Sequence, residues 1–336
     1  MPSAGARAPS TAAFSPAGTA SLATYDIDPA KVFVAGISAG GFFGVQMHVA
    51  HSRTFKGAAI YAGGVYHCAE DSLTIALAAC GGEGLYQSTL AASEQYLDQQ
   101  SAAGTIDASS NLAGQPVYLW SGTNDTVVSP LEMNDLASEY RRYGAHIVAY
   151  DKTYPAGHGW ESPDGELACS TQASPYMVRC SNAAGAYDSE QTWLQAFFGS
   201  LSPRNGGTLS GSLLPFDQTA FGASASNSMD NTGYVFVPHN CAKGARCGLV
   251  VALHGCLQTQ ADIVLRFITE SGIDEWADRN SIVVLYPYAI KSSSPTAYNP
   301  QGCWDWWGYD DPNYSLRSGT QMSAVYAMVQ RITGRP

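Results

Sequence analysis

Charged side chains are scarce in this sequence. Asp, Glu, Lys and Arg make up 13% of the 336 residues, against roughly 25% in an average soluble protein. No block of Lys or Arg occurs, and the formal net charge of −11 disfavours binding to phosphate backbones or to anionic membranes. The sequence also lacks any apolar run near the ~20 residues that span a bilayer. We therefore expect a protein that binds neither nucleic acid nor membranes.

Signals for targeting and for metal binding are missing as well. The first twenty residues are rich in Ala, Ser, Pro and Gly but hold no apolar core of a signal peptide, so residues 1–20 are predicted to be a flexible leader. No Cys-x-x-Cys occurs, and no two histidines stand at ligand spacing beside the cysteines, which disfavours a zinc site. We expect neither a metal ion nor an organic cofactor.

The sequence does contain eight cysteines, and most have a close neighbour along the chain. Eight cysteines allow 105 connectivities, but this spacing favours local pairs. Four disulfides are predicted, and with them a secreted or periplasmic protein, because disulfides persist in oxidising compartments. The near neighbours are Cys68 and Cys80, Cys169 and Cys180, and Cys241 and Cys247, which leaves Cys256 and Cys303.

Continuous apolar runs rich in β-branched residues recur along the chain and predict strands buried on both faces of a mostly parallel sheet. Amphipathic stretches between them predict helices. This alternation indicates an α/β fold with helices on both faces of a central sheet, formed as a single domain by residues 21–336. The predicted strands are 32–36, 57–63, 116–122, 146–151, 234–238, 249–255 and 282–287, and the clearest helices are 131–143, 188–199, 260–279 and 317–332.

The stretch 200–230 allows two interpretations. Its Ser and Gly content is typical of a linker between domains. It also holds four large apolar residues, which equally predict a strand pair that joins the main sheet: Leu209, Leu213, Leu214 and Phe216.

A serine nucleophile is indicated by Gly-x-Ser-x-Gly at residues 36–40, which ends an apolar strand and opens a helical stretch. Glycines flank Ser38 because such a turn strains the backbone at the nucleophile and brings helix and strand close together. The motif occurs in unrelated Gly-rich sequences, and its position between a strand and a helix is what favours the catalytic interpretation.

Serine needs a histidine to accept its proton and a carboxylate to orient that histidine, and in α/β hydrolases the acid and then the histidine follow the serine in the chain. Asp125 lies directly past the predicted strand 116–122, and His158 lies in a glycine-bearing loop after the next strand. A surface histidine would be the alternative interpretation of His158. The remaining candidates are worse placed, namely Asp135, Asp151, His48, His51, His67 and His146.

Acyl transfer also needs two N–H donors for the oxyanion. The amide of Ala39, just after the nucleophile, is one candidate. The other normally comes from a His-Gly loop before the nucleophile, but here His254-Gly255 follows Ser38 by more than 200 residues. The strands and helices of residues 249–332 are those that usually precede the serine. The chain therefore looks circularly permuted, and its two ends are expected to lie close together.

Six motifs together resemble the extracellular poly(3-hydroxybutyrate) depolymerases, in particular the single-domain, circularly permuted type known from fungi. The motifs are GISAGG, SGTNDTVV, AGHGW, VALHGCLQ, WADRNSIVVLYP and GCWDWWGY. The similarity extends over about residues 21–333, including all eight cysteines. It implies an α/β-hydrolase fold, Ser38, Asp125 and His158 as the catalytic triad, and the amides of Ala39 and Cys256 as the oxyanion hole.

The same resemblance implies how the cysteines pair and where substrate binds. The implied disulfides are Cys68–Cys80, Cys169–Cys180, Cys241–Cys247 and Cys256–Cys303, and the last would hold the oxyanion donor against the wall of the substrate crevice. The implied wall residues are Trp304, Trp306, Trp307 and Tyr309, although four such aromatics are also typical of a core. The family has a tryptophan where this chain has Tyr309.

The predicted activity is that of a secreted, extracellular and monomeric serine esterase. It would hydrolyse poly(3-hydroxybutyrate) and related short-chain polyhydroxyalkanoates through an acyl-enzyme, without a cofactor. An alternative is a feruloyl or acetyl esterase of plant-wall polysaccharide. A non-catalytic protein on a hydrolase scaffold is disfavoured, because the serine, acid, histidine and His-Gly-Cys motifs are all present.

Overall fold

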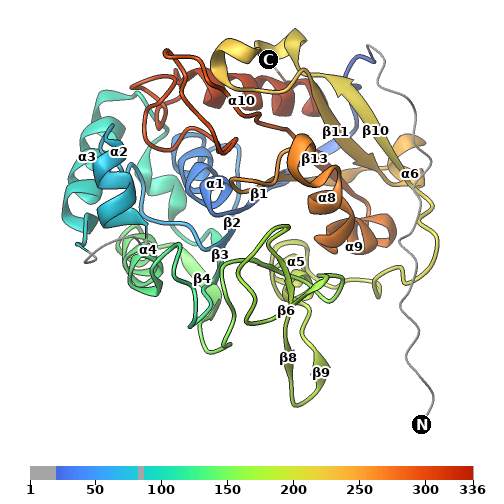
Figure 1. The fold of residues 1–336 in the computed structure, drawn as a ribbon. Helices are drawn as coiled ribbons and strands as arrows, with labels where there is room; N and C mark the ends of the chain where they lie inside the picture. The colour runs from blue at the N-terminus through green and yellow to red at the C-terminus, as the bar shows by residue number, and fades with distance from the viewer. Residues whose placement is uncertain (1–19, 82–86, 336) are drawn as a thin grey trace.

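The computed structural model describes residues 20–81 and 87–335. Its centre is an eight-stranded sheet in which the two strands at one end run antiparallel to their neighbours and the others pair in parallel. Figure 1 shows this sheet crossing the molecule between layers of helices. In spatial order the strands are β10 (Ser212–Asp217), β11 (Thr232–Val237), β13 (Ile282–Tyr286), β12 (Cys247–Leu253), β1 (Ile27–Ile37), β2 (Ala58–Tyr61), β3 (Pro116–Trp120) and β4 (His146–Asp151).

Each face of the sheet has its own apolar core. Along β1, Val32 and Val34 belong to one core, whereas Phe33 and Ala35 belong to the other. This alternation explains why the strand sequence is continuously apolar. The first core includes residues of α1 (Ala39–Ala50), α3 (Leu90–Ala103), α4 (Pro130–Arg142) and α10 (Thr320–Thr333), and the second includes residues of α5 (Ser189–Phe198), α8 (Arg266–Glu270) and α9 (Ile273–Asn280).

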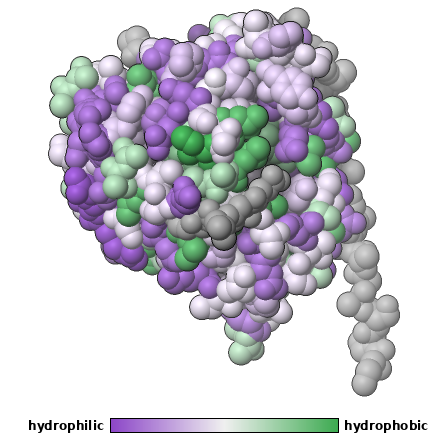
Figure 2. Space-filling view, turned by 60° about the vertical axis from the view of Figure 1, so that its left-hand side comes forward, coloured by the Kyte–Doolittle hydropathy of each residue, from purple (hydrophilic) through white to green (hydrophobic). Residues whose placement is uncertain are grey.

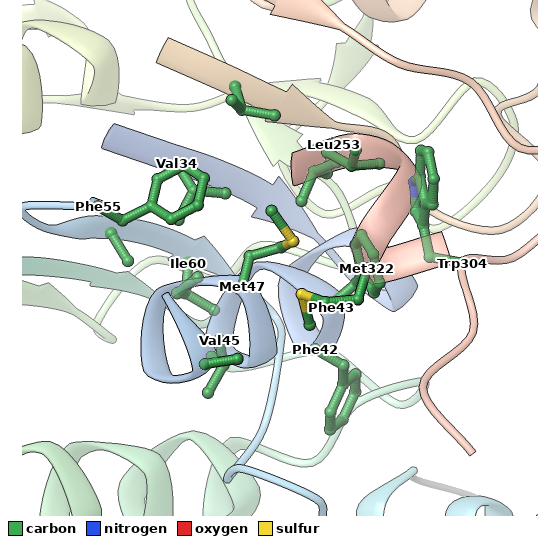
Figure 3. Packing of buried hydrophobic residues seen from close by; sticks show 14 of the residues in the cluster. Val34, Phe42, Phe43, Val45, Met47, Phe55, Ile60, Leu253, Trp304 and Met322 are labelled. Carbon is green, nitrogen blue, oxygen red and sulfur yellow. The ribbon is translucent and has the colours of Figure 1, made fainter. Parts of the chain in front are cut away.

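Helix α1 lies in the middle of the first core. All twelve of its residues are buried, which is unusual for a helix that packs on one face of a sheet. Figure 3 shows side chains of α1, including Phe43 and Met47, packed near Val34, Ile60 and Leu253 of three neighbouring strands. The turn that carries Ser38 therefore leads into a helix whose residues are all buried.

Shorter elements connect these layers. The structure assigns a small three-stranded sheet and a two-stranded hairpin to the segment between β4 and α5. The short elements are α2 (Leu73–Ile75), the π-helix η1 (Ala76–Cys80), η2 (Ser109–Leu112), β5 (Trp160–Glu161), β6 (Leu167–Ala168), β7 (Met177–Arg179), β8 (Ser181–Asn182), β9 (Gly185–Ala186), η3 (Thr219–Phe221), η4 (Ala225–Asn227), α6 (His239–Ala242) and α7 (Gln260–Ile263).

The predicted α/β architecture is confirmed, with one correction to its helices. The stretch 260–279 was expected to form one helix but forms α7, α8 and α9. The backbone takes positive φ angles at Val264 (57°) and Gly272 (75°), which a continuous helix does not allow. Of the two interpretations of residues 200–230, the strand pair is confirmed, because β10 pairs with β11 in the main sheet.

The start of β1 meets the end of α10. Tyr25 N–H donates to the carbonyl oxygen of Ile332 at 2.9 Å, and Arg331 Nε donates to the carbonyl oxygen of Leu22 at 2.8 Å. The predicted closeness of the chain ends therefore holds for the described residues. The predicted leader lies, except for its last residue, outside them.

All four implied disulfides are present: Cys68–Cys80, Cys169–Cys180, Cys241–Cys247 and Cys256–Cys303. Within residues 20–81 and 87–335, every helix is too short or too polar to cross a lipid bilayer.

Candidate active site

Ser38 occupies the sharp turn between β1 and α1. Its backbone takes φ 57° and ψ −125°, a strained conformation for a residue with a side chain. The turn is held in place because Ser38 N–H donates to the carbonyl oxygen of Tyr61, the last residue of the neighbouring strand β2, at 2.9 Å. The side chain is 9% exposed, so the hydroxyl lies at the edge of the core rather than in open solvent.

Gly40 lets this turn pack against β12. A Cβ at this position would lie 2.4 Å from the carbonyl oxygens of both Leu253 and His254. Because no side chain fits there, the second glycine of the motif, Gly40, is required by packing. As a result, the His254-Gly255-Cys256 turn packs closely against the start of α1.

Asp125 and His158 form a buried pair at the carboxyl ends of neighbouring parallel strands, β3 and β4. His158 Nδ1 and Asp125 Oδ2 are 2.8 Å apart. A carboxylate can only accept here, so Nδ1 carries a proton and donates it to Asp125, which leaves Nε2 as the ring nitrogen available to Ser38. The other oxygen, Asp125 Oδ1, accepts the N–H groups of Val127 and Val128 at 2.8 and 2.9 Å. The carboxylate is therefore fixed in the orientation that holds the imidazole.

The other histidines near α1 have structural partners. His48 hydrogen-bonds Tyr140 and Gln115, His51 stacks on Tyr326, and His67 hydrogen-bonds Ser315. Burial lowers the pKa of His48 to about 4, of His51 to about 3 and of His67 to about 4. These imidazoles are neutral groups of the core.

The His254-Gly255-Cys256 turn lies against Ser38. A Cβ on Gly255 would lie 3.1 Å from Ser38 Cβ. Ala289 N–H donates to His254 Nε2 at 3.1 Å, so Nδ1 carries the proton and donates to the carbonyl oxygen of Gly255 at 2.8 Å. His254 therefore fixes the turn, a role that the His-Gly motif alone did not reveal. This places two backbone segments, one from each half of the chain, beside the serine.

The amides of Ala39 and Cys256 belong to these two segments. Ala39 is the first residue of α1, so its N–H has no acceptor within the helix. On either side of Cys256 the amides are engaged, because Gly255 N–H donates to Gln258 and Leu257 N–H donates to Gln301. The roles of the Ala39 and Cys256 amides as oxyanion donors remain predictions.

The expected aromatic wall needs correction at Trp304. This side chain is fully buried and stacks on Phe43 of α1, with ring centroids 5.1 Å apart. It is a core residue rather than a surface for substrate. Trp306 stacks on Phe42 at 4.2 Å and is 9% exposed, whereas Trp307 is half-buried.

Tyr309 also has a structural role, because its hydroxyl donates to the carbonyl oxygen of Cys303 at 2.9 Å. Trp306, Trp307 and Tyr309 remain predicted wall residues, and Trp307 is the most accessible of the tryptophans that the structure describes. The wall residues follow Cys303, whose disulfide to Cys256 joins their loop to the turn beside Ser38.

The sequence reasoning missed Asp305, which organises this loop. Its buried carboxylate accepts four backbone N–H groups at 2.8 to 3.1 Å, those of Gly308, Tyr309, Asp310 and Asp311. These four hydrogen bonds to Asp305 close the loop that carries Trp306 and Trp307. An aspartate three residues before a glycine was the available sequence signal.

No group of three or more His, Cys, Asp or Glu side chains in the part of the chain that the structure describes could hold a metal ion. The geometry instead combines a strained serine, an imidazole held by a carboxylate, and backbone amides from two segments. This combination can perform nucleophilic acyl transfer.

Comparisons with known proteins agree with this chemistry. The prolyl oligopeptidase family matches residues 16–183. The polyhydroxybutyrate depolymerase of Talaromyces funiculosus is 37% identical over 325 residues, which cover 93% of this chain and 92% of the relative. A poly(3-hydroxybutyrate) depolymerase of Delftia acidovorans is 40% identical over 319 residues, but this chain spans only 61% of that protein's length.

Solved structures give the same result. The crystal structure of the PHB depolymerase from Penicillium funiculosum matches with a TM-score of 0.84 and 35% identity, and the match covers 94% of this chain and 99% of that one. A PHB depolymerase complexed with an R3HB trimer matches equally well. The fold is thus that of an α/β hydrolase.

Proposed function

The chain belongs to the polyhydroxybutyrate depolymerase family, with residues 16–183 matching the prolyl oligopeptidase family, and we propose that it is a serine esterase. Its proposed substrates are poly(3-hydroxybutyrate) and related short-chain polyhydroxyalkanoates, which it hydrolyses to monomers and short oligomers. The observation that carries the proposal is the Asp125–His158 pair at 2.8 Å, on the same sheet edge as the strained Ser38 turn.

In the acylation half of the proposed reaction, Ser38 Oγ attacks the ester carbonyl and His158 Nε2 takes the serine proton. Asp125 stabilises the imidazolium that forms. The amides of Ala39 and Cys256 donate to the oxyanion of the tetrahedral intermediate. The intermediate then collapses as the C–O bond to the leaving chain breaks, and His158 gives its proton to the departing hydroxyl group.

Deacylation repeats these steps with water. His158 takes a proton from water as the water oxygen attacks the acyl carbonyl, and then returns it to Ser38 Oγ. The products are a free hydroxyl end and a carboxylic acid, and the serine is restored. His158 carries each proton in both halves of the reaction, and the backbone amides only donate hydrogen bonds to the oxyanion.

An apolar surface beside the acid supports a polyester substrate. Leu73 and Leu77 are 50% and 44% exposed on the α2–η1 segment, and Val127 and Leu131, at 40% and 53%, follow Asp125. The carbonyl groups of Leu77 and Val127 both lie against Gly81, so the two segments are neighbours. We call these four residues the apolar patch. On the face that brings α2 to α4 forward, Figure 2 shows apolar surface gathered near the centre of the molecule.

The four disulfides support the further proposal that the protein is secreted and extracellular. We also propose that it acts as a monomer on solid or oligomeric polyester and does not bind nucleic acid, in line with its net charge of −11. A feruloyl or acetyl esterase activity is not favoured, since the relatives are named for polyhydroxybutyrate.

Clearing of a turbid poly(3-hydroxybutyrate) suspension tests the proposal. Wild type should clear the suspension and release hydroxybutyrate and its short oligomers, whereas Ser38→Ala should not. A serine-directed phosphonate should label wild type alone. Wild type that releases ferulate or acetate from plant-wall polysaccharide, but leaves the suspension turbid, would contradict the proposed substrate and keep the esterase chemistry.

A further inference from the structure

A buried carboxyl group lies behind the catalytic histidine, on the second core face of the sheet. Glu190, in the first turn of α5, is fully buried. Its Oε1 accepts the indole N–H of Trp160 at 2.8 Å. Trp160 follows His158 by two residues and is itself fully buried, so this hydrogen bond fixes the chain segment that presents the imidazole.

The same carboxyl group contacts the strand that holds the nucleophile. Tyr61, whose carbonyl accepts the amide of Ser38, stacks on Trp160 with ring centroids 4.0 Å apart. Its hydroxyl lies 3.4 Å from Glu190 Oε1 and 2.7 Å from Ser189 Oγ. Glu190 thus joins the supports of His158 and Ser38, although it touches neither of them.

Too many carboxyl groups meet here for all to be charged. One guanidinium, that of Arg204, forms ion pairs with Asp164, Asp188 and Glu275. Glu190 and Glu161 lie next to this set and form no ion pair within residues 20–81 and 87–335, and both accept hydrogen bonds from Ser189. The titratable and charged groups near Glu190 are Tyr61 on β2, Glu161 on β5, Asp188 and Arg204 in loops, and Asp164, which lies near the same space beside Gly272.

The hydrogen bonds indicate where a proton sits on Glu190. Oε1 takes the N–H of Trp160, so it acts as an acceptor. Oε2 has no hydrogen-bond partner among the described residues. Oε2 lies beside Gly272. A Cβ added to Gly272 would lie 3.4 Å from Glu190 Oε2, 2.8 Å from Ser162 Oγ and 3.5 Å from Asp164 Oδ2. Oε1 already accepts hydrogen bonds from Trp160 and Ser189, whereas no donor in the described part of the chain stabilises a negative charge on Oε2, so a proton on this carboxyl group belongs on Oε2.

Burial agrees with this assignment. Burial, and then the charges of Asp188 and Glu161, raise the pKa of Glu190 well above its usual range, and burial raises the pKa of Glu161 to about 8. A buried carboxylate without a cation costs several kcal/mol, so it takes up a proton instead.

We propose that Glu190 is a neutral carboxyl group that positions Trp160 and Tyr61, and through them the imidazole of His158 against Ser38. It is a positioning residue, because it reaches no reacting atom. This inference rests on the proposed esterase function. Its test uses a soluble ester, so the result does not depend on activity toward the polymer.

Two variants separate shape and hydrogen bonding from charge. Glu190→Gln keeps the acceptor at Oε1 and the neutral state, so kcat on p-nitrophenyl butyrate should stay within roughly threefold of wild type. Glu190→Ala leaves a cavity and leaves the indole N–H of Trp160 with only its longer hydrogen bond, to the carbonyl oxygen of Ser271 at 3.2 Å. Its kcat should fall about 10- to 100-fold with little change in KM, since a misplacement of about 1 Å at the site has such effects. The rate of phosphonate labelling at Ser38 should fall in parallel.

A pH profile and an infrared spectrum test the proton. Wild type should lose kcat at alkaline pH as Glu190 ionises, whereas Glu190→Gln should retain it to higher pH. The infrared difference between wild type and Glu190→Gln at neutral pH should contain the carbonyl stretch of a protonated carboxyl group. The matched control is Glu139→Gln. This variant changes a buried carboxyl group that does not contact Trp160 or Tyr61, so it should keep the kcat and the alkaline pH profile of wild type.

Three outcomes would overturn the proposal: Glu190→Gln as inactive as Glu190→Ala, Glu190→Ala with unchanged kcat, or no protonated carboxyl band in the difference spectrum. Should Glu190→Ala unfold, Glu190→Gln and the infrared band still decide. Loss of polymer clearing alone, with activity on the soluble ester intact, would contradict the proposed substrate and leave this inference standing.

Discussion

The amide of Tyr25 donates to the carbonyl oxygen of Ile332 at 2.9 Å, which joins the start of the central strand β1 to the end of the last helix, α10. The His254-Gly255-Cys256 turn follows β12 late in the chain, yet Gly255 contacts the nucleophile turn that follows β1. Both observations support the interpretation of a circular permutation, in which the usual chain start lies in the long segment before β10.

A re-permuted chain should therefore fold and work. We expect a variant with a short linker from Arg335 to Ala20, and new ends between the exposed Gly206 and Gly207, to keep kcat within about threefold. Activity on p-nitrophenyl butyrate and thermal unfolding would measure this. A control with new ends between Val34 and Ala35 cuts the central strand and should not fold. An inactive but folded first variant would contradict the prediction.

Asp125→Asn should lower kcat about 10³- to 10⁴-fold with little change in KM, because the amide can no longer hold His158 with its proton on Nδ1. Steady-state kinetics on a soluble ester would measure the loss. Asp135→Asn changes the neighbouring acid on α4 and should stay near wild type. A fall of less than tenfold for Asp125→Asn would point to another acid.

Much of this fold could be predicted from residue patterns, because a strand buried on both faces leaves a continuous apolar run. Helix α3 escaped prediction, since it is largely polar and buries only Ser93 and Leu97. The break of residues 260–279 into three helices depends on backbone angles at Val264 and Gly272 that periodicity does not report.

The proposed triad residues could be named from their order and loop positions, and the structure brings two of them, Asp125 and His158, into hydrogen-bonding contact. Burial of each aromatic side chain could not be predicted. Trp304 and Trp306 are two residues apart, but one lies in the core beside Phe43 and the other at its edge. Glu190 gave no signal, because its importance depends on contacts with Trp160 and Tyr61, which lie 30 and 129 residues away.

Removing the Cys256–Cys303 bridge should affect both stability and rate. The bridge closes a span of 47 residues, so replacing both cysteines with serine should cost about 4 kcal/mol of unfolding free energy. It should also lower kcat, because the turn beside Ser38 loses its link to the loop of Trp306. Urea unfolding and kinetics would measure the two effects.

The matched control removes Cys241–Cys247, whose span is 6 residues. It should cost about 2 kcal/mol and leave kcat unchanged. Equal losses of kcat in the two double variants would contradict a specific role of the Cys256–Cys303 bridge at the active site.

The apolar patch should bind the solid substrate. Replacing Leu73 and Leu77 with serine removes exposed apolar surface and should reduce adsorption to poly(3-hydroxybutyrate) granules, whereas activity on p-nitrophenyl butyrate should not change. Centrifugation with granules in a Ser38→Ala background would measure adsorption. Leu214→Ser, at an exposed position of β10 at the far end of the sheet, is the control. Unaltered adsorption of the double variant would exclude this surface.

The pH dependence of stability should carry a contribution from Glu139 on α4. Its buried carboxyl group accepts hydrogen bonds from Tyr66 N–H, at 2.8 Å, and from Ser93 Oγ. Burial raises the pKa of Glu139 from its ordinary 4.5 to about 8. The folded protein therefore binds this proton more tightly than the unfolded chain. The resulting stabilisation is complete below pH 4.5 and is lost as the pH rises toward 8, by at most about 1.4 kcal/mol per pH unit.

Glu139→Gln cannot titrate, so the unfolding free energy of this variant relative to wild type should increase steadily between pH 5 and pH 8 and then level off. Urea unfolding at several pH values would measure this difference. Glu70→Gln, at an exposed position, should show no such trend. A difference between Glu139→Gln and wild type that stays constant over this range would mean that Glu139 is already ionised in the folded protein at pH 5. Its hydrogen bonds from Tyr66 and Ser93 would then outweigh its burial.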